Sequence, residues 1–373
     1  MKVIISGGGI AGLTCAIALD KLGIETEVYE AASEIKPVGA GLVLQSNAIK
    51  ALEYISIEDK IIEAGNPVNQ LAIYKENGRV IKKQKPESKN RELFGGIAIH
   101  RHTLHNILKS YLDDKIFFLN KRAESFTSAD DKVVLQFEDG TQAEGDYLIS
   151  TDGINSNIRQ QIISGSKPRY AGYLCWRAVV DNVFEIKEAS ETWGRKGRFG
   201  IVPINDNKLY WFAVITGHEF DSRLNQFTVE NIAEQFSGYH SPIEDIINST
   251  PNEALIKNSI SDLKPLSRFA FDKVLLIGDA AHATTPNLGQ GACQAIEDVM
   301  ILHQEISSNK DMLQAFKSFE KRRLEKTKFI INTSRKMGAI AQTSNLLVVI
   351  VRNFLFSITP EFITERQLRK IYN

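Results

Sequence analysis

The sequence of 373 residues is poor in cysteine, in net charge and in long apolar segments. Its three cysteines, Cys15, Cys175 and Cys293, are scattered without a CxxC pair or a metal-ligand spacing, which argues against a disulfide reductase and against a metal site. We expect them to be small buried residues in a reducing compartment. Lys plus Arg and Asp plus Glu each count 45, so the net charge selects neither nucleic acid nor an anionic membrane as partner.

Two apolar segments are candidates for a signal or a membrane span, and neither has the required pattern. Four glycines between positions 7 and 12 interrupt the N-terminal segment, where a signal peptide needs an unbroken apolar core. The stripe from Leu346 to Ile358 contains Arg352 and Asn353 and is too short to cross a bilayer. We therefore expect a cytoplasmic protein without a transmembrane segment. The stripe is expected to pack as core across two domains, with a dimer contact or a membrane-surface contact as alternatives.

The N-terminal stretch has the pattern of a dinucleotide-binding unit. Val3 to Ile5 forms a short buried strand, and Gly7-x-Gly9-x-x-Gly12 leads into a helix. In this fingerprint Gly7 makes the tight turn, Gly9 admits the pyrophosphate and Gly12 allows close helix packing. A second strand ends at Glu30, which is placed to accept hydrogen bonds from ribose hydroxyls. No later segment repeats the fingerprint, which indicates one resident dinucleotide.

A second glycine-rich turn follows another buried strand. Val274 to Ile277 is a continuous apolar run, and Asp279 lies at its carboxyl end, where open α/β sheets bind ligands. After Pro286, the sequence Gly289-Gln290-Gly291 opens a helix. The unpaired N–H groups at such a helix start suit an anionic ligand atom.

This second turn resembles the second FAD motif of the group A flavoprotein monooxygenases, the aromatic-hydroxylase family. In that family the Asp matching Asp279 binds the ribityl chain, and the helix points its N-terminus at the flavin ring. The segment from Tyr147 through Asp152 to Arg159 resembles the middle motif of the family, whose Asp-Gly pair contacts the pyrophosphate side of FAD. A structural alternative is that Arg159 pairs with Asp152 and holds the turn.

The same resemblance implies further FAD contacts. The Arg matching Arg101 reaches the cofactor in the family, and Gly39 and Gly41 look like its flexible loop near the flavin ring. For either glycine, a plain surface turn is an equal alternative. His100 and His102 flank Arg101, but no carboxylate or cysteine completes a metal-binding set, so we expect no metal.

Between the motifs, residues 170–217 alternate as aromatic-rich strands without a helix-period segment, which predicts an antiparallel sheet. The expected fold class is α/β, with a Rossmann-like FAD-binding domain, an inserted antiparallel-sheet substrate domain and C-terminal helices. The FAD-binding domain is assigned residues 1–70, 98–165 and 268–310. The substrate domain is assigned residues 71–97 and 166–267, and the helical segment residues 311–373.

A hairpin in this sheet predicts the substrate pocket. The turn-forming Asn205-Asp206-Asn207 separates two strands, so that Arg198 pairs with Val214 and Val202 pairs with Tyr210. Side chains alternate along strands, which places on one face Arg198, Gly200, Val202, Tyr210 and Phe212. We expect Arg198 to orient or ionise the substrate and Tyr210 to hydrogen-bond it. The alternative is that Arg198 is exposed to solvent and Tyr210 only packs.

The resemblance is strongest to the urate hydroxylase, salicylate hydroxylase and zeaxanthin epoxidase branches, and the C-terminal helices are also similar to those of tetracycline-inactivating members. It implies non-covalent FAD, NAD(P)H as a transient co-substrate, and O₂ forming a flavin C4a-hydroperoxide. The substrate would be an electron-rich aromatic or heteroaromatic small molecule that is hydroxylated or epoxidised. The alternatives are a tetracycline-type polyketide-inactivating monooxygenase, a flavin oxidoreductase without oxygen insertion, and a non-enzymatic flavin-fold binding protein. No nucleic-acid partner is expected, and monomer and homodimer both remain open.

Overall fold

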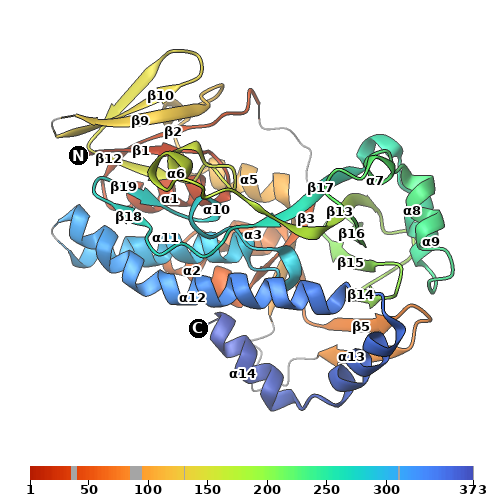
Figure 1. The fold of residues 1–373 in the computed structure, drawn as a ribbon. Coiled ribbons are helices and arrows are strands. Elements are labelled where there is room, and N and C mark those ends of the chain that lie inside the picture. Colours follow the sequence, from red (N-terminus) through yellow and green to blue (C-terminus); the bar gives the residue numbers. More distant parts are fainter. Residues whose placement is uncertain (35–39, 85–94, 130, 310, 373) are drawn as a thin grey trace.

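The computed structural model describes residues 1–34, 40–84, 95–129, 131–309 and 311–372. Its described strands form two large sheets and two small ones, and its helices cover the sheets and extend along one side (Figure 1). The predicted mixed α/β fold with a Rossmann-like unit, an antiparallel sheet and C-terminal helices is confirmed.

The first large sheet is the Rossmann-like unit and has the strand order β18-β19-β12-β1-β2-β8. All its pairs are parallel except β18 with β19. Its strands are β1 (Lys2–Ser6), β2 (Glu25–Tyr29), β8 (Phe117–Phe118), β12 (Tyr147–Ser150), β18 (Ala270–Phe271) and β19 (Val274–Leu276). The side chains of Val3, Ile4 and Ile5 are fully buried, as expected for a parallel strand covered on both faces.

Helices on both faces of this sheet complete the largest hydrophobic core. They include α1 (Ile10–Asp20), α2 (Ser46–Tyr54), α5 (Arg101–Lys109), α11 (Gly291–Ser308) and α12 (Met312–Ala341). The helix predicted after Gly291 therefore exists and continues to Ser308. The strands β1, β12 and β19 come from distant parts of the chain, and their carboxyl ends bring together the three motifs that the sequence separates.

The second large sheet has the order β17-β13-β16-β15-β14-β5-β6, and all its pairs are antiparallel except β14 with β5. Its strands are β5 (Leu71–Lys75), β6 (Val80–Gln84), β13 (Arg169–Asp181), β14 (Ala189–Trp193), β15 (Arg198–Ile204), β16 (Lys208–Thr216) and β17 (Ile256–Asp262). The predicted register of the β15–β16 hairpin is confirmed, with Arg198 opposite Val214 and Val202 opposite Tyr210. Asp206 and Asn207 take positive φ angles in its turn, which Asp and Asn tolerate better than other side chains.

One face of this second sheet is a closed core. Trp176, Phe199 and Trp211 pack there against a group of short helices. These helices are α7 (Ser222–Asn225), α8 (Val229–Gln235) and α9 (Ile243–Asn248) (Figure 1). Because side chains alternate along each strand, the residues between these aromatic rings point to the opposite face.

The remaining elements flank the two large sheets. The small sheets are β3 (Gly41–Gln45) with β7 (Gly96–His100) and β4 (Asn66–Val68), and β9 (Ala123–Ala129) with β10 (Lys132–Phe137) and β11 (Gln142–Gly145). The other helices are α3 (Glu58–Ala64), α6 (Asn157–Ile162), α10 (Asp279–His282) and the 3-10 turns η1 (Asp114–Ile116), η2 (Asn252–Ala254) and η3 (Pro286–Leu288).

A buried ionic cluster fixes the turn after β19 to the helices behind it. The Arg323 side chain of α12 is 1% exposed, donates to Asp298 Oδ1 at 2.6 Å and forms an ion pair with Glu297. The other oxygen of Asp298 accepts from the backbone N–H of Gly278 at 2.9 Å and lies 2.6 Å from His282 Nε2. Burial alone would raise the pKa of Asp298, but His282 and Arg323 outweigh it and hold that pKa below its ordinary value.

The prediction that residues 346–358 pack as core is wrong. These residues form α13 (Leu346–Ile358), and α14 (Glu361–Tyr372) follows it along the lower edge of the molecule (Figure 1). Eight large apolar side chains of α13 are at least 50% exposed. Within the described residues no single helix is long and apolar enough to cross a membrane. Only α13 and α14 taken together reach the length and apolar composition of a span, and they are bent by 92° relative to each other.

The ionic cluster gives a stability prediction. Arg323→Ala removes the buried cation that Asp298 and Glu297 share, and only Glu297 keeps a second one, Lys326 at 2.7 Å, so we expect a loss of about 3–5 kcal/mol in the free energy of unfolding. Arg322→Ala is the matched control, because Arg322 pairs with Glu305 at the surface and is 42% exposed, which predicts a loss of about 1 kcal/mol or less. Urea-induced unfolding measures both. Equal losses in the two variants would contradict this account of the cluster.

Candidate active site

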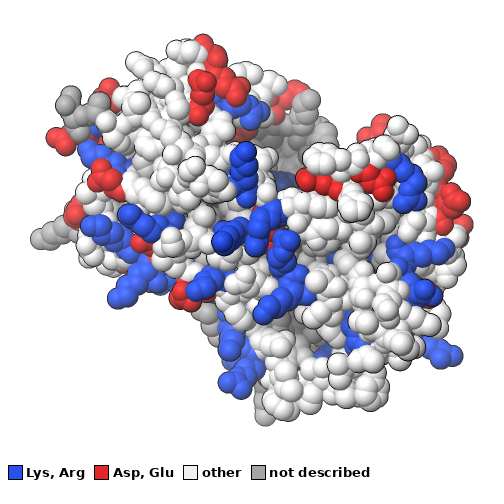
Figure 2. All heavy atoms as spheres, in the orientation of Figure 1, with Lys and Arg blue, Asp and Glu red and all other residues white. Residues whose placement is uncertain are grey.

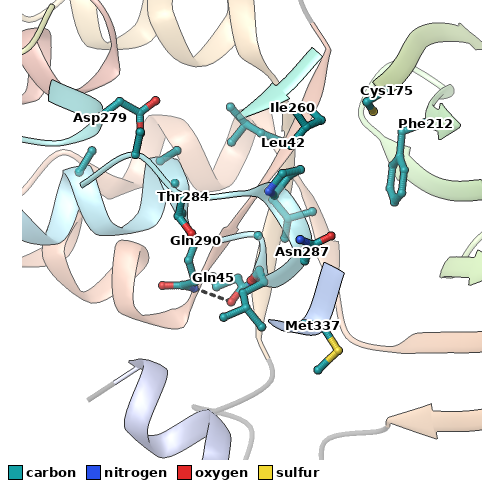
Figure 3. Close-up of a pocket in the computed structure, with 18 of the residues that line it drawn as sticks. Leu42, Gln45, Cys175, Phe212, Ile260, Asp279, Thr284, Asn287, Gln290 and Met337 are labelled. Atoms are coloured by element: carbon teal, nitrogen blue, oxygen red, sulfur yellow. Dashed lines mark hydrogen bonds between the residues drawn. The ribbon is translucent and has the colours of Figure 1, made fainter. Parts of the chain in front are cut away.

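A single cavity of about 2400 Å³ joins the carboxyl ends of the parallel strands to the open face of the second sheet. Small-molecule pockets typically have about 300–1,000 Å³, so this cavity has room for a dinucleotide and a second molecule. Figure 3 shows Asp279 on one side of it and Phe212 with Cys175 on the other, with Asn287 between them.

The three fingerprint glycines have three different surroundings. Gly7 has φ +103°, and a Cβ there would lie 2.6 Å from the carbonyl oxygen of Thr151. A Cβ at Gly12 would lie 1.9 Å from the carbonyl oxygen of Gly7, so α1 packs directly onto the turn. A Cβ at Gly9 would meet nothing within 4 Å, although Gly9 lines the cavity. Gly7 and Gly12 therefore serve the fold, whereas Gly9 leaves open space in the cavity.

Glu30 lies at the end of β2 and lines the same part of the cavity. Its two carboxylate oxygens accept hydrogen bonds from the backbone N–H groups of Gly8 at 2.7 Å and Ala32 at 2.8 Å, which fix the side chain in place. Each oxygen has a further lone pair available for a ribose hydroxyl.

Gly41 and Arg101 line the cavity beside the β3–β7 pair, while Gly39 lies outside the described residues. A Cβ at Gly41 would lie 2.6 Å from Cβ of Tyr210, so this glycine lets β3 approach the second sheet closely. Arg101 begins α5 with an exposed side chain, and its backbone N–H donates to the carbonyl of Ala40 at 3.2 Å.

In the middle motif, Arg159 does not form the ion pair with Asp152 that was the structural alternative. Asp152 lines the cavity and accepts a hydrogen bond from Ser150 Oγ, and burial raises the pKa of its carboxyl group. The fully buried Arg159 donates instead to the carbonyl oxygens of Ile154 at 2.6 Å, Ser166 at 3.1 Å and Ala280 at 3.2 Å. Arg159 therefore ties the middle motif to the Asp279 turn by backbone contacts rather than by pairing with Asp152.

Asp279, Pro286, Gly289 and Gly291 all line the cavity where α11 begins. Solvent reaches the Asp279 side chain through the open cavity. Desolvation by the surrounding protein nevertheless raises the pKa of its carboxyl group, and the nearby His282 and Arg101 reduce this increase. Gly289 has φ +62°, a left-handed conformation that glycine adopts without strain. A Cβ at Gly291 would meet nothing within 4 Å.

These surroundings fit a bound flavin. Among the described residues no side chain caps α11, so the first N–H groups of an 18-residue helix are directed toward the cavity. Thr284 also lines the cavity, and its buried hydroxyl has no hydrogen-bond partner in the described part of the chain. Gln290 is fully buried and donates to Gln45 Oε1 at 2.7 Å, which closes the cavity behind the helix start (Figure 3).

The second sheet provides the opposite wall. Val202, Tyr210, Phe212 and Arg198 all line the cavity, as the hairpin register predicts. The expected glycine gap at position 200 is filled, because a Cβ there would lie 2.1 Å from the Phe212 ring. Burial raises the pKa of Tyr210, so its hydroxyl stays protonated and able to donate.

Arg198 is 4% exposed, which excludes the alternative that it faces solvent. Its three nitrogen atoms donate to Glu191 Oε1 at 3.0 Å, Asn287 Oδ1 at 2.7 Å and Gln342 Oε1 at 3.0 Å. Asn287 in turn donates to the hydroxyl of Tyr173 at 2.8 Å. The guanidinium therefore joins the second sheet to the loop between Asp279 and Gly291.

Sequence reasoning missed a second cation in this wall. Arg177 lies opposite Phe212 in the β13–β16 pairing, lines the cavity, and has its Nε 3.3 Å from Cys175 Sγ. Cys175 and Tyr210 raise the pKa of Arg177, so it is charged. The alternation along β13 could have placed Arg177 and Cys175 on one face, but nothing local to β13 reveals its register with β16.

Comparisons with known proteins agree with this geometry. Residues 1–311 match the family model described as FAD binding domain, so the chain belongs to this family, and its cofactor is FAD. It is an FAD-dependent monooxygenase of the aromatic-hydroxylase type, as the sequence motifs predict.

Two relatives and one solved structure illustrate the similarity. The aurachin C monooxygenase/isomerase of Stigmatella aurantiaca is 34% identical over 359 residues, covering 95% of this chain and 93% of the relative. The 2-heptyl-3-hydroxy-4(1H)-quinolone synthase of Pseudomonas aeruginosa is 31% identical over 378 residues, covering 100% and 98%. The crystal structure of Klebsiella pneumoniae HpxO with FAD and uric acid superposes with a TM-score of 0.91 at 26% identity, covering 100% and 96%.

The glycine surroundings predict two distinct mutant phenotypes. Gly9→Val places a side chain in open space, so the apoprotein should keep its melting temperature but lose bound FAD. Gly12→Val drives a side chain into the Gly7 carbonyl, so it should lower the melting temperature of the apoprotein itself. Visible flavin absorbance and thermal unfolding of the apoproteins separate the two effects. A Gly9→Val variant that retains FAD would refute the placement of the cofactor.

Proposed function

We propose that this protein uses NAD(P)H and O₂ to hydroxylate a planar heteroaromatic ring that carries an alkyl chain, of the 4-quinolone type. The proposal rests on one cavity. It runs from the FAD fingerprint past the aromatic wall of Tyr210 and Phe212 into a further part near the C-terminal helices, which we call the apolar arm. Bound FAD supplies the oxygen-activating redox chemistry, and the chain supplies binding, orientation and exclusion of water.

The apolar arm favours a substrate with an alkyl chain. Beyond the second-sheet wall, the cavity is lined by the apolar side chains of Trp193, Met337 and Phe356. At α14 the lining contains apolar residues such as Phe362 and Ile363 together with polar ones such as Arg366. Figure 3 places Met337 at the lower edge of the cavity, away from Asp279. A small polar ring such as urate would leave this arm without an apolar occupant, whereas an alkyl chain would bury about 0.8 kcal/mol per methylene group there.

The names of the two relatives support the same class. One is a synthase of a quinolone with a heptyl chain, and the other is named for aurachin C. The quinolone synthase aligns with 100% of this chain, which includes the C-terminal helices that line the arm, and the aurachin C enzyme aligns with 95% of it.

The polar groups of the wall have separate proposed roles. The Tyr210 hydroxyl donates to the carbonyl oxygen on the substrate ring, with the charged Arg177 beside it. Arg198 acts as a positioning residue, because its nitrogen atoms are already bonded to Glu191, Asn287 and Gln342. The seven-stranded sheet is thus the substrate-binding part of the molecule, and the three motifs around the parallel sheet are the FAD-binding part.

A substrate comparison tests the function. FAD-loaded protein is given NADH or NADPH with 2-heptyl-4(1H)-quinolone, with unsubstituted 4(1H)-quinolone, or with urate. We expect the heptyl compound to stimulate NAD(P)H oxidation and to gain one oxygen atom by mass spectrometry. The unsubstituted ring should have a KM at least about tenfold higher, because it lacks the methylene contacts.

Each contrary outcome has a defined meaning. Oxygenation of urate but of neither quinolone would replace the proposed substrate class with that of the structural neighbour. Stimulated NAD(P)H oxidation that yields only hydrogen peroxide with every compound would favour a flavin oxidoreductase without oxygen insertion.

The role of Tyr210 gives a separate prediction. Tyr210→Phe keeps the ring and removes one hydrogen bond to the substrate, so kcat/KM should fall by about 2- to 13-fold, corresponding to about 0.5–1.5 kcal/mol. The share of NAD(P)H that ends as hydrogen peroxide should rise. Tyr54→Phe is the control, because Tyr54 is 44% exposed at the surface. If both variants matched the wild type in turnover and coupling, Tyr210 would have no substrate contact.

A further inference from the structure

The helix α13 has its polar and apolar faces reversed relative to a surface helix. Its inner face carries Val349, Arg352 and Asn353, which are buried to between 4% and 8% exposure. Its outer face carries one polar side chain, Ser357, among eight large apolar ones that are each 50% exposed or more: Leu346, Leu347, Val348, Ile350, Val351, Phe354, Leu355 and Ile358. An ordinary helix at the surface of a globular protein buries its apolar stripe and exposes its polar one.

The inward orientation is fixed by specific contacts. The Arg352 guanidinium donates to the carbonyl of Ala341 at 2.9 Å and to Asn353 Oδ1 at 2.9 Å, and it lies 5.0 Å from the centre of the Trp193 ring. Phe356 packs edge-on against the same Trp193 ring. Because these polar groups are satisfied inside, a rotation of α13 that buried the apolar face would break them. The outward apolar face is thus built into the fold.

The geometry of this face indicates what covers it. At about 100° per residue, the eight outer side chains extend over about 200° of the helix circumference. The contact stripe between two packed helices is much narrower, so a second helix would leave most of this surface in water. A fluid lipid surface adapts to the whole width, with the helix lying in the interface plane.

Charge around the face agrees with an anionic lipid surface. Residues 342–360 contain no Asp or Glu, and apart from the buried Arg352, residues 342–372 contain three basic and two acidic residues, a net charge of 3 − 2 = +1. Lys83 of the neighbouring strand β6 and Arg195, which donates to the carbonyl of Ser344, are both exposed. In Figure 2 white atoms predominate at the lower edge of the molecule, where α13 lies, with a few blue side chains around them.

We propose that the outer face of α13 docks this protein onto the surface of a lipid bilayer. Exposed Phe362 of α14, which also lines the cavity, extends the same apolar surface to the cavity mouth. Docking would therefore bring the mouth of the apolar arm next to the lipid. This inference rests on α13 itself and does not depend on the proposed substrate.

The test is flotation of the FAD-loaded protein with vesicles of phosphatidylethanolamine and phosphatidylglycerol. The test variant combines Leu347→Ser, Val351→Ser and Phe354→Ser, which lie near the middle of the outer face. The control variant combines Val183→Ser and Phe220→Ser, which remove apolar side chains that are 71% and 86% exposed elsewhere. We expect wild type and control to float and the test variant to lose at least tenfold in vesicle-bound fraction.

Flavin absorbance and thermal unfolding should be unchanged in both variants, because all five positions point outward. Weaker flotation of the wild type on phosphatidylcholine vesicles would support the charge contribution. The proposal is overturned if the wild type stays with the unbound fraction. It is also overturned if the wild type is a dimer that does not float and that the α13 substitutions convert to a monomer.

Discussion

The contact between Arg198 and Asn287 sets the distance between the two halves of the cavity. Arg198 belongs to the wall formed by the second sheet, and Asn287 belongs to the loop between Asp279 and Gly291. The guanidinium is buried and fully paired, so neither side can move without leaving a charged group unsatisfied. The position of the second-sheet wall relative to the start of α11 therefore depends on this bridge and on the hydrogen bond from Asn287 to Tyr173 of β13.

The start of α11 is held equally firmly from behind. Arg323 joins Asp298 and Glu297 of α11, and Asp298 in turn accepts from the Gly278 backbone at the head of the Asp279 turn. A helix end aimed at an anionic ligand stabilises it only if the helix cannot withdraw. The ionic cluster provides that rigidity, while no side chain fills the cavity at Gly9 and Gly291.

The C-terminal helices relate the cavity to the outside of the molecule. Gln342, the residue after α12, accepts a hydrogen bond from Arg198, and Met337 of α12 lines the cavity. Phe356 of α13 packs against Trp193, and both also line the cavity. The same packing turns the apolar side of α13 outward. The inward polar face of α13 thus accounts for its apolar outer surface.

The sequence by itself determined the local units: the glycine fingerprint, the Asp279 turn, the hairpin with its register, and the membership in a flavin-dependent family. Each of these depends on neighbouring residues, through backbone conformations that glycine permits and through the period of apolar side chains. Only the tertiary structure decided that Arg198 is hydrogen-bonded to Asn287 and Gln342 and that Arg177 lies in the second-sheet wall of the cavity. It also decided that α13 exposes its apolar face. Those outcomes depend on pairings between residues far apart in the chain, and an apolar helical stripe has the same periodicity whether it faces a core or a lipid surface.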